Sequence, residues 1–376
     1  MTASDEVLIQ ELPTAGKALL GHAHLNVEAT LNALSLSMAR VLDAALRDWQ
    51  KRDDIAGVVI TAAGDKAFCA GGDIQALYRA ITANHAAAEV VDTYPFDFFA
   101  EEYRLDYLLH TYGKPVITLG HGIVMGGGLG ILCASEYRLL TEKSRLAVPE
   151  ITIGLFPDAG ATWTLGKMEP RHALFLALTG SHANATDSLL TGMGHHVVAH
   201  DQRDACLQQL VALAWSGDGA VDRSQLDELL ASLTERGLAP AVMPESELGP
   251  IAPGVIDFTN LQAEAEGIYA LEGQSPWIDR GINNLRNGCP TTAGIVLEQL
   301  RRVPDMTLAD AFRMELTVAT HCAFNHDFSE GVRALLIDKD NQPQWAYGDI
   351  AHLDWQHVLN HFAPPWPEHP LADLGA

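Results

Sequence analysis

The sequence predicts an α/β fold built from repeated strand–strand–helix units, with a helical extension at its C-terminal end. Apolar runs at residues 55–61 and 114–120 are typical of buried strands, and the second run is bounded by Gly and Pro. The order of two strands and then one helix differs from a Rossmann fold, in which single strands and helices alternate. Beyond residue 256 four segments have helical periodicity, which predicts the helical extension.

The first 236 residues supply these units in order along the chain. A hairpin-like turn at residues 13–16 joins the first two strands, and residues 32–35 open a helix whose apolar spacing continues to Trp49. Strands are predicted at residues 7–12, 18–25, 55–61, 114–120 and 146–150, and helices at 32–49, 74–81, 94–112, 201–216 and 222–236, with two more between 171 and 190.

Three successive glycines, Gly126, Gly127 and Gly128, precede an apolar run that predicts a helix. Glycines let the backbone approach a ligand closely, and a helix that starts there points free N–H groups and its positive dipole end at an oxygen. The segment is therefore a candidate oxyanion hole, in which one donor is typically worth about 3 kcal/mol of barrier. Gly72 precedes another predicted helix and offers a second N–H, while Asp73 after it is a candidate helix cap.

Two carboxylates follow the triple glycine. Glu150 stands at the end of the predicted strand 146–150, where an acidic residue costs energy unless it is paired or solvated. Asp158 precedes a helix predicted to run through Lys167, so it is either the N-cap of that helix or a functional carboxylate. Glu150 is the better catalytic candidate, and the two interpretations of Asp158 stay open.

The composition excludes several classes of partner. The 24 Lys and Arg against 48 Asp and Glu give a net charge of −24, so nucleic acids and anionic membranes are repelled at long range. Five widely spaced cysteines without a CxxC pair predict buried thiols in a reducing compartment. Three histidines at 195, 196 and 200 lack a metal-binding pattern, so we expect surface histidines and no metal site.

The length of 376 residues suggests two units, or one domain with an extension. Prolines at 240, 244, 250 and 253 interrupt the periodicity, which predicts a core at residues 1–236, a linker or wrapping loop at 237–256 and a helical subdomain at 257–376. The helices of that subdomain are predicted at residues 262–271, 277–287, 291–302 and 308–322. No signal peptide, transit peptide or membrane span is recognised, so we expect a soluble cytoplasmic protein.

Three motifs, at residues 66–74, 125–128 and 149–160, together resemble the enoyl-CoA hydratase/isomerase (crotonase) superfamily. Hydratases of that superfamily carry a second glutamate two residues after the triple glycine, where this chain has Gly130. The combination of Glu150 with Asp158, and the segment 326–340, resembles the 3-hydroxyisobutyryl-CoA hydrolase branch. The resemblance extends from about residue 7 to about 362 and is weakest between about 201 and 276.

The resemblance implies a crotonase-like spiral of ββα turns, including a short strand at 194–200, and hydrolysis of a short-chain hydroxyacyl-CoA thioester. The substrate it implies first is 3-hydroxyisobutyryl-CoA, an intermediate of valine catabolism; coenzyme A is part of this substrate, and no separate cofactor is expected. The amides of Gly72 and Gly127 would stabilise the oxyanion, and Glu102, Gly126 and Gly128 would contact the substrate. Glu150 would act as nucleophile or as general base. Asp158 would bind the substrate hydroxyl or handle the leaving-group proton.

Two alternatives and two open questions accompany this hypothesis. The chain could hydrate or isomerise an enoyl-CoA with Glu150 alone, or it could be a non-catalytic acyl-CoA-binding or scaffolding homologue. Because the chain is acidic, an anionic CoA ester requires a local basic or backbone-rich pocket, for which Lys17, Lys66, Arg79 and Lys339 are candidates. The acyl group and the oligomeric state are left open, although many crotonases form trimers or pairs of trimers.

Overall fold

The computed structural model describes residues 3–254, 256 and 258–375 and divides the chain into two compact units. The first unit contains the chain up to Gly72 together with Leu108–Leu146 and Ala183–Gly249. The second contains Asp73–Tyr107, Ala147–His182 and the chain from Pro250 onward. The predicted division at 236 and 257 follows the order of the chain, whereas these units are assembled from distant segments. The division into a core, a linker and a helical subdomain stays a prediction.

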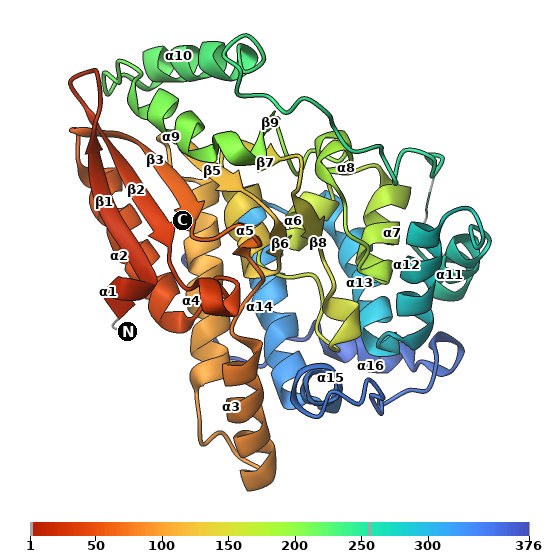
Figure 1. Ribbon diagram of the computed structural model, residues 1–376. Helices are drawn as coiled ribbons and strands as arrows, with labels where there is room; N and C mark the ends of the chain where they lie inside the picture. Colours follow the sequence, from red (N-terminus) through yellow and green to blue (C-terminus); the bar gives the residue numbers. More distant parts are fainter. Residues whose placement is uncertain (1–2, 255, 257, 376) are drawn as a thin grey trace. The chain divides into compact units, whose positions relative to one another are not determined.

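The first unit is organised around a six-stranded sheet in the order β1-β2-β3-β5-β7-β9 (Figure 1). β1 and β2 pair antiparallel, as the hairpin-like turn predicts, and the other neighbours are parallel. The strands are β1 (Val7–Pro13), β2 (Leu19–Leu25), β3 (Ile55–Ala62), β5 (Val116–Gly120), β7 (Tyr137–Thr141) and β9 (His196–Val198).

A smaller sheet carries the glycine-rich segments. It has the order β4-β6-β8, with β4 (Ala67–Cys69), β6 (Ile123–Met125) and β8 (Arg145–Ala147), and α5 (Gly127–Ala134) begins two residues after β6. The remaining helices of the first unit are α1 (Ala3–Glu6), η1 (Glu28–Thr30), α2 (Leu36–Lys51), α8 (Ala185–Leu190), η3 (His200–Gln202), α9 (Arg203–Val211) and α10 (Gly219–Ala231).

The large sheet is covered on one face by α9 and α10 (Figure 1). Leu20, Val59 and Leu139 from the strands share one buried cluster with Leu210 and Leu226 from these helices. Burial of such side chains stabilises each by about 1.5–3 kcal/mol relative to exposure. The strands and these two helices therefore share one hydrophobic core.

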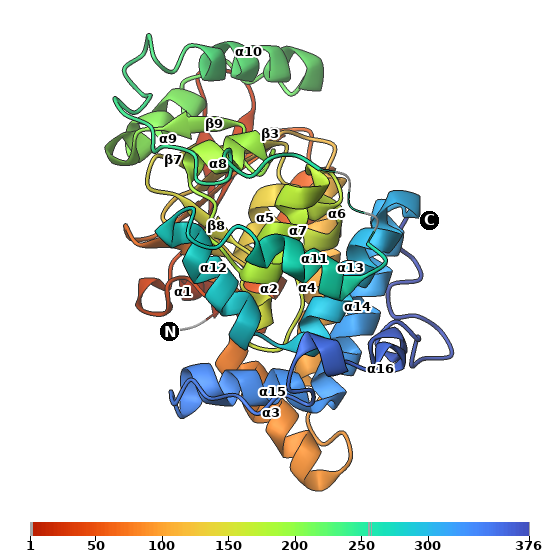
Figure 2. The same ribbon diagram turned by 90° about the vertical axis from the view of Figure 1, so that its right-hand side faces the viewer.

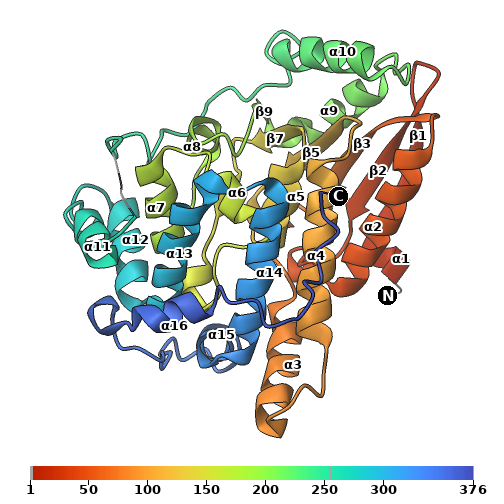
Figure 3. The ribbon, with the colours of Figure 1, turned by 180° about the vertical axis from the view of Figure 1, so that it is seen from behind.

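The second unit is helical in the part of the chain that the structure describes. α4 and α14 run side by side in Figure 3. The rings of Tyr103 and Tyr107 on α4 contact the ring of Phe312 on α14. Figure 2 shows α11, α12 and α13 of the same unit on the side that is turned toward the viewer. The elements are α3 (Ile74–Ala87), α4 (Tyr94–His110, whose last turn belongs to the first unit), η2 (Glu150–Thr152), α6 (Ala161–Leu165), α7 (Pro170–Thr179), α11 (Leu261–Tyr269), α12 (Pro276–Asn287), α13 (Pro290–Arg302), η4 (Val303–Asp305), α14 (Leu308–Phe324), α15 (His326–Val332), the π-helix η5 (Arg333–Ile337), η6 (Ile350–His352) and α16 (Trp355–Asn360).

The predicted α/β class is confirmed, and each helix predicted in residues 262–322 is present within one or two residues of its expected ends. The strand predicted at 146–150 is wrong in length, because β8 ends at Ala147 and Glu150 opens the 3-10 turn η2. Pro149 between them has no N–H to donate to a neighbouring strand. The sequence did not predict β4, β6, β7, α15 or α16. No helix in the described residues is long and apolar enough to cross a membrane.

Candidate active site

Among the described residues of the second unit, five buried carboxyl groups have a pKa raised above the usual range. Glu102 and Asp106 lie one turn apart on α4, Glu150 opens η2, Asp158 precedes α6, and Glu315 comes from α14. At most 7% of each residue is exposed. Buried charges repel one another strongly in a medium that screens poorly, so these groups cannot all be ionised at once.

Asp158 is held by a tyrosine and is not a helix cap. The hydroxyl of Tyr103 donates a hydrogen bond of 2.7 Å to Oδ2 of Asp158. The N-cap of α6 is Gly160, two residues later, so the capping interpretation of Asp158 is wrong. Burial raises the pKa of Asp158 to about 6, against the lowering effect of the Tyr103 hydrogen bond. A carboxyl with that pKa exchanges protons readily near neutral pH.

Gly160, the N-cap of α6, has no side chain that could accept hydrogen bonds from the first amides of the helix, and Glu315 accepts them instead. Its two carboxyl oxygens accept the backbone N–H groups of Gly160 and Thr162 at 2.8 and 2.9 Å. Burial raises its pKa to about 8, although these hydrogen bonds favour the ionised form. The first turn of α6 is thus capped by a side chain from α14.

Glu150 has one carboxyl oxygen with no partner among the described residues. Its Oε2 is buried without a hydrogen bond, and only 5% of the residue is exposed. Burial first, and then the negative charge of Asp158, raises the pKa of Glu150 well above its usual range. Such a group can take up a proton far more readily than an ordinary glutamate, which suits a general base.

Glu102 and Asp106 extend the acidic cluster along α4. Burial raises the pKa of both groups well above the usual range, and the charges of Asp158 and Glu315 raise them further. Within the described residues, Oε1 of Glu102 and both oxygens of Asp106 are buried without a hydrogen-bond partner. Only 2% of Glu102 is exposed, so this residue does not lie on a solvated face of α4.

In the first unit, two glycine loops lie against each other. Gly71 has a φ of 111°, and a Cβ built on it would lie 3.7 Å from the carbonyl oxygen of Met125 and 4.0 Å from Cα of Gly126. Gly126, with a φ of 47°, is the N-cap of α5, which places Gly127 at its first helical position. The first amides of a helix have no partner inside it, so the amide of Gly127 is a candidate donor. Gly72 follows Gly71 directly and forms an isolated bridge with Leu34.

The sequence comparison decides the family. Residues 20–362 match the sequence model described as enoyl-CoA hydratase/isomerase. The chain belongs to this family. Within it, the chain is 34% identical over 371 residues to a zebrafish protein (Danio rerio) named 3-hydroxyisobutyryl-CoA hydrolase, mitochondrial, with 95% of this chain and 89% of that protein covered. A human protein of the same name is 32% identical over 366 residues, with 96% and 89% covered.

Solved structures of the family have the same fold. A structure described as a carnitinyl-CoA dehydratase from Mycobacterium thermoresistibile is 27% identical, with a TM-score of 0.80 and coverage of 97% of this chain and 98% of the other. One described as an enoyl-CoA hydratase from Rhodobacter sphaeroides is 29% identical, with a TM-score of 0.77 and coverage of 96% and 98%. The predicted crotonase-like fold is confirmed by these likenesses.

The predicted site residues of this family member fall into two groups. Glu102, Glu150 and Asp158 belong to the acidic cluster of the second unit, and Gly72 with the glycines at 126–128 belongs to the two loops of the first. Their roles stay predictions. The sequence analysis missed Tyr103, Asp106 and Glu315. A signal for Glu315 existed, because it stands among apolar residues on the buried face of α14, where an unpaired acid is costly.

In the described part of the chain, no group of three or more His, Cys, Asp or Glu could hold a metal ion. His195 is exposed, but the expectation of a surface position is wrong for His200, which is buried and stacks edge-on against His121. All five cysteines are buried thiols, as predicted.

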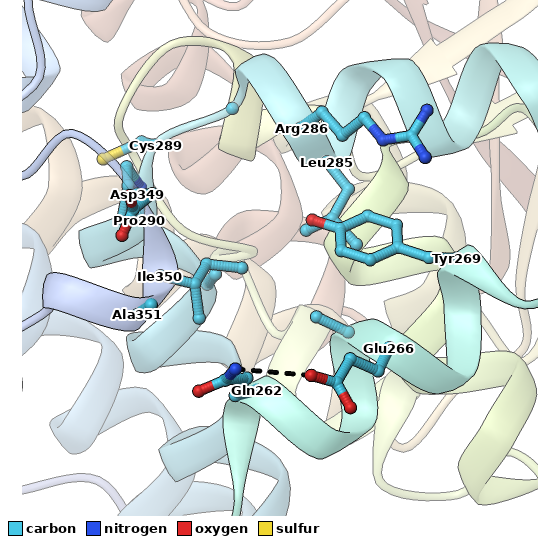
Figure 4. A pocket seen from close by; sticks show the side chains of 13 residues that line it. Gln262, Glu266, Tyr269, Leu285, Arg286, Cys289, Pro290, Asp349, Ile350 and Ala351 are labelled. Carbon is cyan, nitrogen blue, oxygen red and sulfur yellow. Dashed lines mark hydrogen bonds between the residues drawn. The ribbon is translucent and has the colours of Figure 1, made fainter.

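A cavity of about 300 Å³ lies among α11, α12, α13 and η6 of the second unit, and its lining includes Tyr269 and Arg286 but no predicted site residue (Figure 4).

Proposed function

We propose that the protein hydrolyses a short-chain hydroxyacyl-CoA thioester, with 3-hydroxyisobutyryl-CoA as the first candidate substrate. The observation that carries the proposal is the burial of two carboxyls, Glu150 and Asp158, whose pKa values are both raised and of which the charge of Asp158 raises the pKa of Glu150. Two relatives that are 32% and 34% identical over nearly all of this chain bear the name of that hydrolase. Coenzyme A enters as part of the substrate, and no separate cofactor is proposed.

The chemistry requires an oxygen to add to the thioester carbonyl and the sulfur to leave with a proton. In one route Glu150 removes a proton from water as the water oxygen attacks the carbonyl carbon. In the other, the carboxylate of Glu150 attacks, and water then opens the resulting mixed anhydride. Either route produces an oxyanion, for which we propose the amides of Gly72 and Gly127 as donors.

Asp158 completes the proposal as the second acid. Its pKa of about 6 lets it exist in both protonation states near neutral pH, so it can pass a proton to the departing thiolate or accept a hydrogen bond from the substrate hydroxyl. We propose Glu102, Gly126 and Gly128 as further substrate contacts. We also propose that the protein acts in valine degradation, in the cytoplasm and as a homo-oligomer. The names of the two relatives place those proteins in mitochondria.

A second candidate function is hydration of an enoyl-CoA. It is favoured by the likeness to solved structures described as a carnitinyl-CoA dehydratase and an enoyl-CoA hydratase. Against it stands Gly130, buried inside α5, at the position where the family's hydratases carry a second glutamate. A non-catalytic acyl-CoA-binding role is disfavoured because Glu150 and Asp158 are both retained and buried.

The test is release of free thiol from 3-hydroxyisobutyryl-CoA by the native protein, Glu150→Ala and Asp158→Asn. A matched control is Glu298→Gln, since Glu298 is a buried carboxylate on α13 that pairs with Arg301 and Arg302. We expect release to fall by 100-fold or more with Glu150→Ala, by 10-fold or more with Asp158→Asn, and to persist in the control. Hydration of crotonyl-CoA without thiol release would favour the second candidate, and binding without either reaction would favour the non-catalytic role.

A further inference from the structure

The loop that carries Asp158 is held by side chains from two C-terminal helices. The hydroxyl of Thr292 on α13 donates to the carbonyl oxygen of Leu155 at 2.5 Å. The side-chain amide of Gln299, also on α13, donates to the carbonyl oxygen of Pro157 at 2.9 Å and to the hydroxyl of Thr162 at 2.6 Å. These contacts fix the two ends of the segment around Asp158.

Glu315 of α14 fixes the turn between those ends. It accepts the N–H groups of Gly160 and Thr162, which are 155 and 153 residues away in the sequence. Gly160 has no side chain to cap the helix, so this buried turn takes its acceptors from another helix. A carboxyl group offers two oxygens to two donors, whereas an amide would offer one oxygen and one NH₂.

The turn needs support because its backbone is strained. Ala159, directly after Asp158, has a φ of 53°, a left-handed conformation that a residue with a Cβ adopts at a cost. Gly160 follows with a φ of 79°. Such conformations persist where the surroundings over-determine them, and they gather at functional sites.

We propose that Glu315 is a positioning residue for the reaction. By accepting hydrogen bonds from the amides of Gly160 and Thr162, it holds the strained turn in its observed conformation and keeps Asp158 hydrogen-bonded to Tyr103. The inference rests on the proposed function of Asp158. It assigns to a residue of the C-terminal helices a role in catalysis that involves no contact with the substrate.

The test compares Glu315→Gln and Glu315→Ala with the native protein, using Glu298→Gln as the control. We expect the kcat of thiol release to fall by roughly 10- to 100-fold in Glu315→Ala, with KM changed by no more than about twofold, because misplacement of a catalytic group slows turnover. Glu315→Gln keeps one acceptor and is expected to retain more activity than Glu315→Ala. A kcat within twofold of the native value in both Glu315 variants would overturn the proposal.

Hydrogen–deuterium exchange of peptides covering residues 156–165 separates this proposal from the function on which it rests. We expect faster amide exchange there in both Glu315 variants and unchanged exchange in Glu298→Gln, whether or not the native protein hydrolyses the thioester. Unchanged exchange in the Glu315 variants would contradict the positioning role even if their activity fell. Absence of thiol release from the native protein would instead refute the proposed function. Should Glu315→Ala fail to fold, Glu315→Gln provides both readouts.

Discussion

Tyr103 donates its hydroxyl hydrogen to Asp158 across 2.7 Å, in a region where the tyrosine is fully buried. The hydrogen bond stabilises the ionised carboxylate, whereas burial favours the protonated form. The balance leaves the pKa of Asp158 at about 6. Tyr103 therefore favours the ionised form of a candidate catalytic acid, against the larger effect of burial.

Replacement of Tyr103 by Phe should raise the pKa of Asp158. A hydrogen bond to a charged group contributes about 1.5–3 kcal/mol, which corresponds to roughly 1–2 pKa units. The limb of the kcat–pH profile that belongs to Asp158 should move to higher pH by that amount. The profile of Asp158→Asn identifies this limb, because the limb is absent from it. A limb that stays in place in Tyr103→Phe would show that the hydrogen bond does not control the acid.

Glu150→Gln should stabilise the fold while it abolishes turnover. The native side chain buries a carboxyl oxygen that has no hydrogen-bond partner in the described residues, and ionisation of such a group is costly. The neutral amide removes that cost, so the free energy of unfolding in urea at pH 8 should rise by about 1–3 kcal/mol. A lower free energy of unfolding would mean that the carboxyl group of Glu150 stabilises the fold.

The stability of the protein should fall as the pH rises from 6 to 8. Glu315 has a folded-state pKa of about 8, above its unfolded value, so its stabilising contribution is complete below about pH 4.5 and is lost as the pH passes 8. Each such group changes the free energy of unfolding by up to about 1.4 kcal/mol per pH unit in this window. Urea unfolding at pH 6 and pH 8 measures this dependence.

The difference between native protein and Glu315→Gln isolates that one group. The loss of stability between pH 6 and pH 8 should be smaller in the variant by about 2 kcal/mol. Glu298→Gln should keep the native pH dependence, since the pKa of Glu298 is lowered and the group is ionised throughout this range in both states. Equal pH dependence in all three proteins would contradict a raised pKa of Glu315.

Gly128→Ala should distort the glycine loops of the first unit. A Cβ at this position would lie 2.5 Å from the carbonyl oxygen of Cys69, which forces α5 and β4 apart. We expect destabilisation of about 1–3 kcal/mol together with a loss of thiol release. Gly267→Ala on α11 is the control, because nothing lies within 4 Å of its Cβ and alanine favours a helix. A Gly128→Ala protein with native stability and activity would rule out the close approach.

The sequence predicted the elements whose pattern is local. α3 has Asp73 as its N-cap, as predicted, whereas the helix predicted from residue 32 begins at Leu36 with Ser35 as its cap. Short strands such as β4 and β6 escaped prediction, because three residues are too few for a periodic pattern. The same limit explains the overlong strand that was expected to end at Glu150.

The part of the candidate site that was predicted also depends on local sequence patterns. Glu150, Asp158 and the glycines follow one another in motifs, so order and spacing alone pointed to them and to the family. What the sequence by itself determined is therefore the fold class, the family resemblance and three acids of the buried cluster, Glu102, Glu150 and Asp158. Only the tertiary structure decided that Asp158 is held by Tyr103 and that its turn is closed by Glu315. Hydrogen bonds between residues 55 and 155 positions apart depend on how helices pack, which no local pattern encodes.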